Sequence, residues 1–337
     1  RGAIGGMYAG RLGTALHIGT IKPTIRGNTR ESSTLLSSIA TLTLLSGLVL
    51  SAVTSLFLYL FAGATPQEVL LSVLIIIATM ATSVLMISPI TFLISVYSFR
   101  KGLDPDVVVY PIVSTVADVI ITVFYIVMIK GALANYLMIA IADLFYVSIV
   151  VVVVLRNYKD AEYLRTIREF MITLMFVSII VNITGLALEG FTKRIGIPRE
   201  VFAVYPAVID TVGDVGAIVG STATTKIILG LMAPSLRGAR AHSAQILNTW
   251  AASLILFIAY SFVSSLLFGF EHLGRLLLQL VAVNIVVVPL IVLVTIGIAV
   301  LTSSRGWNPD NFITPIVSVL SDSLTTFAIL FVVYIWR

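Results

Sequence analysis

Two aspartates, one in each copy of a repeated segment, are the residues of this chain whose type and spacing best suit the binding of a cation. Asp118 follows the segment 103–111, and Asp322 follows its second copy at 307–315, always 204 positions later. Each copy leads into an apolar stretch that is long enough to lie in lipid. A carboxylate at the centre of a membrane span costs about 2.5–3.5 kcal/mol on insertion scales, and such residues usually mark an ion pathway. Two of them at equivalent positions predict one shared cation site.

The residues around each aspartate supply further oxygen atoms. A serine lies four positions before each one and a proline about one turn further back, as Ser114 with Pro111 and Ser318 with Pro315. Residues four apart share one face of a helix, so each serine should lie beside its aspartate. A proline inside a helix frees a carbonyl about one turn earlier. Together these oxygens predict a lining for a hard cation, unless the aspartates pair with a buried Arg or Lys instead.

Magnesium suits such a lining. It binds oxygen ligands, dehydrates reluctantly and usually keeps several waters while it uses one or two carboxylates. The chain has 3 histidines, at widely separated positions, and 0 cysteines, which disfavours a transition-metal cage. We therefore expect Mg²⁺ as the bound and transported ion, with ligands from Asp118, Asp322, Ser114 and Ser318.

The elements that position these residues must be membrane helices. Of the 337 residues, 58% are hydrophobic and 11% are charged, and the mean hydropathy of +1.08 is far above that of soluble domains. The net charge of +5 indicates membrane topology and not a nucleic-acid partner, since cytoplasmic loops collect Lys and Arg. We expect an all-α, multi-pass protein of the plasma membrane, whose partners are divalent cations and the lipid bilayer.

Apolar runs of about 20 residues predict ten spans. They lie at 3–20, 34–61, 70–98, 107–129, 132–155, 170–188, 203–231, 244–268, 276–302 and 311–335. Alternate loops hold about twice as many basic residues as the loops on the opposite side, so we expect the loops with more basic residues to be cytoplasmic. The chain begins at Arg1 without a start Met, so we expect a further segment upstream.

A tandem duplication organises these helices. Six residues recur at a constant offset of 211, namely Gly2, Gly5, Gly19, Pro23, Arg26 and Gly27 as Gly213, Gly216, Gly230, Pro234, Arg237 and Gly238. We divide the chain into a first repeat at 1–130 that lacks its first helix, a linker helix and loop at 131–169, and a second repeat at 170–337. Five is an odd number of membrane crossings, so direct fusion would leave the second unit inverted in the membrane. The additional linker helix restores its orientation and predicts two parallel repeats.

Parallel repeats are related by an axis along the membrane normal. Asp118 and Asp322 would then face each other across a central pore at one depth. The glycine-rich helices at 3–20 and 203–231 present small-residue faces, which in membranes indicate close packing or a pore lining. A chain that contains both halves needs no partner subunit, so we expect a monomer.

Five further charged residues lie in apolar segments. Asp210 and Asp214 are four apart near the outer end of their span, where they either gather cations at an external mouth or are solvated at the headgroup level. Arg11 and Lys226 should snorkel to the interface or pair with Asp143 or Asp210. Asp143 has no counterpart in the other repeat, and we expect it to be paired within the protein.

These residues carry a family resemblance. The first copy resembles the last membrane helix of MgtE-type magnesium channels at Gly102, Asp104, Pro105, Pro111 and Asp118. Pro206 with the segment 213–216 resembles the proline and the Gly-Asn-Ala-Gly segment of that family's second helix, with Asp214 where asparagine usually stands. The duplicated plan is similar to that of the eukaryotic solute-carrier magnesium transporters, which hold two such cores in one chain.

The resemblance implies a cation pore. In that family the second and fifth helices of two units surround the pathway, and the fifth-helix aspartate binds the hydrated ion, a role that carries over to Asp118 and Asp322. The two halves are not equivalent, because Ala3 stands where the second copy has Asp214, and Asn308 stands where the first has Asp104.

Two other functions would use the same residues. An exchanger that couples magnesium to sodium or protons needs the same aspartates. An intramembrane aspartyl protease pairs two carboxylates to activate water, but the segment 210–214 lacks the first glycine of a Gly-x-Gly-Asp motif, and Asp118 and Asp322 are copies of one context. No Ser-His-Asp order, HExxH helix or phosphate-binding loop occurs. We therefore predict a transporter, not an enzyme, with downhill entry driven by the membrane potential.

Overall fold

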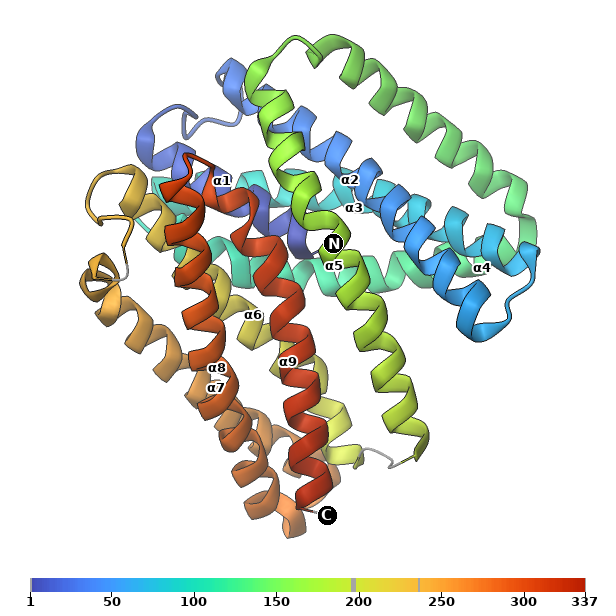
Figure 1. Ribbon diagram of the computed structural model, residues 1–337, viewed down its shortest axis with the longest axis vertical. Helices are drawn as coiled ribbons and strands as arrows, with labels where there is room; N and C mark the ends of the chain where they lie inside the picture. Colours follow the sequence, from blue (N-terminus) through green and yellow to red (C-terminus); the bar gives the residue numbers. More distant parts are fainter. Residues whose placement is uncertain (1, 195–197, 236, 337) are drawn as a thin grey trace. The chain divides into compact units, whose positions relative to one another are not determined.

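The computed structural model describes residues 2–194, 198–235 and 237–336, and Figure 1 shows their path. These residues form nine α-helices and four short 3₁₀ or π segments, with no strand among them. The chain divides into two compact units, Arg1–Asn182 and Ile183–Arg337. Each unit has its own hydrophobic core.

The helices follow one another with short connections. Unit 1 contains α1 (Gly2–Ile18), α2 (Arg30–Phe57), η1 (Leu58–Ala62), α3 (Pro66–Arg100) and α4 (Pro105–Asn157). The next helix, α5 (Ala161–Arg194), begins in unit 1 and ends in unit 2. Unit 2 continues with α6 (Arg199–Ile228), η2 (Gly238–His242), α7 (Ser243–Phe268), η3 (Phe270–His272), α8 (Leu273–Ser304), η4 (Pro309–Asn311) and α9 (Ile313–Ile335).

Eight helical stretches in the described residues are long and apolar enough to cross a membrane, which confirms the expected all-α, multi-pass class. The predicted spans at 107–129 and 132–155 form the single element α4 of 53 residues. At 1.5 Å per residue this is roughly 80 Å, more than twice the thickness of a hydrocarbon core. The helix is broken at Asn135, whose φ of −156° and ψ of 91° are not helical. The Asn135 side chain accepts from the Leu137 N–H at 3.1 Å and so caps the second half.

In unit 1, α1 is enclosed on several sides. Met7 and Leu12 of α1 pack with Leu42 of α2 and Phe170 of α5, while Ala9 packs with the first half of α4 and with α3. A helix that is buried on several sides must be apolar nearly all round. The sequence of α1, in which apolar and small residues predominate, fits this position.

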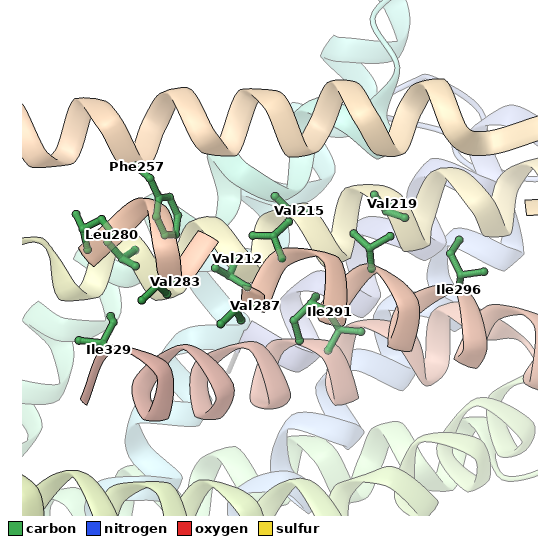
Figure 2. Close-up of a cluster of buried hydrophobic side chains, with 14 of the residues drawn as sticks. Val212, Val215, Val219, Phe257, Leu280, Val283, Val287, Ile291, Ile296 and Ile329 are labelled. Atoms are coloured by element: carbon green, nitrogen blue, oxygen red, sulfur yellow. The ribbon is translucent and has the colours of Figure 1, made fainter. Parts of the chain in front are cut away.

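In unit 2, α6 holds the central position and packs against α7, α8 and α9. Figure 2 shows Val212, Val215 and Val219 of α6 beside Phe257 of α7 and residues of α8 such as Val287. The adjacent side of α6 carries glycines that allow α8 and α9 to approach closely. The predicted close packing of this glycine-rich helix is confirmed within unit 2.

The two copies of the repeated segment have the same local structure. Gly102 and Gly306 adopt φ values of 74° and 70°, a left-handed conformation that glycine tolerates best. The side-chain oxygen of Asp104 accepts from the backbone N–H two residues later at 2.9 Å, and that of Asn308 does the same at 3.0 Å. Both copies therefore begin with the same capped turn, which leads directly into α4 in the first copy and into η4 ahead of α9 in the second.

Candidate functional site

Asp118 lies on the first half of α4 in unit 1. Its neighbours Val113 and Ala117 are buried against α1 and α3. Asp118 and Ser114 are both only partly buried, so they lie beside the packed face and not within it. Because the two residues are four positions apart in continuous helix, they share one strip, as predicted.

Asp322 lies on α9, which packs against α6. The Thr326 hydroxyl donates to the backbone carbonyl of Asp322 at 2.6 Å, so the Tyr205 hydroxyl, 2.6 Å from Thr326 Oγ1, must donate to Thr326. Tyr205 is also within electrostatic range of the Asp322 carboxylate. Ser318, one turn earlier, is partly exposed like Asp322. Tyr205 is thus a polar neighbour of Asp322 that the sequence did not single out.

The two prolines do not have the same effect. Pro111 is the seventh residue of α4, where its missing N–H leaves the carbonyl of residue 107 without its helical donor. Pro315 is the third residue of α9, which begins at Ile313, and N–H groups in the first turn have no partner inside the helix. The expectation of a freed carbonyl in the second copy is therefore wrong, because α9 starts only two residues before its proline.

Asp210 and Asp214 lie one turn apart on α6 and are within electrostatic range of each other. Both also act on Tyr260 of α7, whose hydroxyl is 2.8 Å from Thr211 Oγ1. The Oδ1 atom of Asp214 is buried and has no hydrogen-bond partner in the described part of the chain. These two neighbouring acids lie on one strip of α6.

The helix that carries Asp210 and Asp214 meets the helix that carries Asp322 at a glycine. A Cβ atom added at Gly213 would lie 3.2 Å from Ser321 Oγ of α9. Gly213 precedes Asp214, and Ser321 precedes Asp322, so the structure brings these two carboxylates onto touching helices at one level of unit 2. Asp118 belongs to unit 1, and its meeting with Asp322 across one pathway stays a prediction.

The two basic residues in apolar segments have partners other than those expected. Arg11 Nη2 lies 2.7 Å from Glu162 Oε1 of α5, because α5 begins at Ala161, well before the predicted span at 170–188. Lys226 Nζ lies 3.0 Å from His242 Nδ1. Asp210 is sixteen residues before Lys226 on the same helix, roughly 24 Å away.

Asp143 is not paired within the described residues, contrary to expectation. Its side chain is buried, with 6% of the residue exposed, and neither carboxyl oxygen has a hydrogen-bond partner there. One expected partner, Arg11, instead pairs with Glu162.

One cluster in unit 1 was not predicted. A nitrogen of His17 and one carboxylate oxygen each of Asp104 and Asp106 lie within 4.8 Å of one another. His17 Nδ1 is 2.8 Å from the Gly13 carbonyl, which can only accept, so Nδ1 carries the hydrogen and Nε2 is the nitrogen near Asp104, at 3.8 Å. A side chain at Gly13 would overlap the Asp106 carboxylate. Histidine and carboxylates suit a divalent metal.

The second copy does not repeat this cluster. Ile228 stands at the position equivalent to His17, and Asn308 stands at that of Asp104. The inequivalence of the halves that the sequence indicates therefore extends to this group of ligands.

Comparison with known proteins identifies a family. A family model, MgtE, described as a divalent cation transporter, matches residues 1–128 and 205–333. Searches among curated proteins and among solved structures found no significant match. The first matched segment contains Asp118, the second contains Asp210, Asp214 and Asp322, and the linker half of α4 lies outside both. Because the two segments together cover most of the chain, the protein belongs to the MgtE family of divalent cation transporters.

Proposed function

We propose that this chain carries Mg²⁺ across the membrane along a pathway to which Asp118 and Asp322 each contribute a carboxylate. One observation carries the proposal: the family model matches the chain twice, and each matched segment ends in a helix with an aspartate at the equivalent position, 204 residues apart. The identical capped turns at Asp104 and Asn308 support the equivalence of the two helices.

The chemistry of the site favours a hydrated ion. Magnesium usually keeps several waters and uses few protein ligands, so carboxylates near partly exposed hydroxyls such as Ser114 and Ser318 suffice. In unit 2, Asp214 lies on the helix that touches the Asp322 helix, and Asp210 lies one turn further along α6. We assign to these two acids the collection of cations ahead of Asp322.

The membrane potential supplies the driving force in this proposal. A potential of 100 mV is worth about 2.3 kcal/mol per elementary charge, and therefore about 4.6 kcal/mol for a divalent cation. Entry down this gradient needs no coupled ion. One chain holds both aspartates, so we further propose that the monomer is the transporting unit and that it acts in the plasma membrane.

The test is Mg²⁺ flux into proteoliposomes under a negative-inside potential. We compare the native chain with Asp118→Asn, Asp322→Asn and the double variant, and use Glu271→Gln as the matched control because Glu271 is an exposed acid in η3. Each single variant should lose about tenfold or more of the flux, equivalent to roughly 1.4 kcal/mol, and the control should keep it.

Two results would count against the proposal. Native-level flux in the double variant would show that the aspartates do not line the pathway. If Mg²⁺ flux requires a sodium or proton gradient, the mechanism is coupled exchange and not downhill entry.

A further inference from the structure

Asp143 is a buried acid that the proposed pathway does not use. It lies on the second half of α4, outside both segments that the family model matches. Only 6% of the residue is exposed. Neither carboxyl oxygen has a hydrogen-bond partner within the described ranges, and the ion pairs found there involve other residues.

Apolar side chains enclose this carboxyl from both directions along the helix. Ile139 lies about one turn before Asp143 and Tyr146 about one turn after it, so all three share one face. Ile139 packs against α3, and Tyr146 packs with Leu44 of α2 and Ile77 of α3. The face that contains Asp143 is therefore directed at α2 and α3.

The charges on α2 and α3, which pack around this face, lie far along those helices from Leu44 and Ile77. They are Arg30 and Glu31 on α2 and Glu68 and Arg100 on α3, while α4 and its N-cap carry Asp104, Asp106, Asp118, Lys130 and Arg156. Glu31 precedes Leu44 by thirteen residues and Glu68 precedes Ile77 by nine, which is roughly 13–20 Å along a helix. The acids of the first half of α4 and Lys130 all precede the break at Asn135. Lys130 lies beside Gly131, where an added Cβ would be 3.2 Å from Ile139 Cδ1, but no ion pair in the described residues joins Lys130 to Asp143.

The local titratable neighbour also has a partner of its own. Tyr146 lies on the same face as Asp143, and its hydroxyl donates to the Ala40 carbonyl of α2 at 3.2 Å. This bond directs the phenol toward the α2 backbone. We find no cation within the described part of these helices that balances the Asp143 carboxyl.

An ionised carboxylate without a partner is strongly disfavoured in apolar surroundings, and such a group takes up a proton instead. A metal ion suits the position poorly, because Mg²⁺ and Ca²⁺ require a shell of about six or more oxygens and the residues around this one carboxyl are mainly aliphatic. The proton is therefore the ligand that the surroundings favour.

We propose that Asp143 is a proton-binding site that holds the linker half of α4 against α2 and α3. The carboxyl keeps its proton while the helix is packed. Loss of the proton places a charge between apolar surfaces and loosens this packing. The break at Asn135 is the point at which the linker half separates from the half that carries Asp118.

The first test compares the thermal unfolding of the full native chain, Asp143→Asn and the control Glu271→Gln in detergent from pH 5 to pH 9. An unfolded aspartate releases its proton near pH 3.9, while the folded site keeps it. The folding equilibrium constant of the native chain should therefore fall by up to tenfold per pH unit relative to Asp143→Asn. Glu271→Gln should follow the native profile. Equal pH profiles for the native chain and Asp143→Asn would overturn the proposal.

A second measurement detects the proton directly. The infrared carbonyl band of a protonated carboxylic acid should be present in the native chain at neutral pH and reduced in Asp143→Asn, with no change in Glu271→Gln. If Asp143→Asn does not fold, Asp143→Leu replaces it in both experiments, since leucine has the same branching of heavy atoms and cannot ionise. An infrared band that is the same in the native chain and the folded variant would refute proton binding at Asp143.

A third measurement tests whether the proton holds the linker half of α4 against α2 and α3. Amide hydrogen exchange in residues 136–157, corrected for the intrinsic pH dependence of exchange, should become faster in the native chain as pH rises and should stay constant in the Asp143 variant. Corrected exchange that is independent of pH in the native chain would show that the proton does not hold this helix.

Discussion

Gly216 on α6 allows a sharp test of the packing in unit 2. A methyl group added at this glycine would fall on Val317 Cγ1 of α9 and would lie 2.9 Å from Ile291 Cγ2 of α8, where ordinary van der Waals contacts begin at 3.4 Å. Val and Ile each have one strongly preferred χ1 rotamer in a helix, so neither side chain can swing aside. The three helices must move apart to accept Gly216→Ala.

The magnitude follows from two opposing effects. Overpacking of this kind costs about 1–3 kcal/mol, while alanine improves helix propensity over glycine by about 1 kcal/mol. Gly297 of α8 is the matched control, because nothing lies within 4 Å of a Cβ added there. Propensity acts equally in both variants. The free energy of unfolding should therefore be lower in Gly216→Ala than in Gly297→Ala by about 1–3 kcal/mol.

The assay is denaturant unfolding of the native chain and both variants in the same detergent, with the slope on denaturant checked for equality. Gly216→Ala as stable as Gly297→Ala would refute the reasoning, because it would mean that α8 and α9 do not press on this glycine. Lower Mg²⁺ flux at unchanged stability would show instead that the glycine face lines the pathway.

Three further predictions concern polar groups. Asp104→Asn should change the free energy of unfolding by less than about 0.5 kcal/mol in thermal melts, because the amide oxygen can still accept from the Asp106 N–H, as the asparagine of the second copy does. Backbone N–H donors hold the pKa of Asp160 below its ordinary value. The ionised Asp160 side chain therefore stabilises the fold above about pH 4, and this stabilisation is lost as pH falls through the folded pKa. The melting points of the native chain and Asp160→Asn should converge as the pH is lowered below about 4. Asn284→Ala should lower the free energy of unfolding by about 1–3 kcal/mol, because the Trp250 indole N–H loses its acceptor at 3.0 Å; chemical unfolding followed by tryptophan fluorescence checks this, and a cost near zero would contradict it.

Most of the helical elements could be predicted from the sequence, because the length of an apolar run and its fit to the bilayer are local properties. The prediction of ten spans differs from the structure at α4, where two spans are joined through Asn135, at α5, which begins at Ala161, and at α1, whose 17 residues are not among the eight candidate spans. The differences at α4 and α5 lie at the ends of the predicted spans, where polar residues continue a helix beyond its apolar part.

The candidate aspartates could also be chosen from the sequence alone. A carboxylate in an apolar span is costly wherever the helix packs, and the repetition of Asp118 as Asp322 is visible in the printed residues. The family match to both segments rests on the same local patterns. What these residues do together stays a prediction.

Only the tertiary structure decided the partners of the other charged groups. Arg11 meets Glu162 across 151 positions of sequence, Lys226 meets His242 and not an acid, and Asp143 has no hydrogen-bond partner in the described residues. The cluster of His17 with Asp104 and Asp106 likewise depends on how the end of α1 lies against the start of α4. Helix periodicity gives the face on which a side chain lies, but which helix covers that face depends on the packing of the whole unit. For that reason the sequence identified the charges in the membrane helices, and the fold determined which of them are balanced.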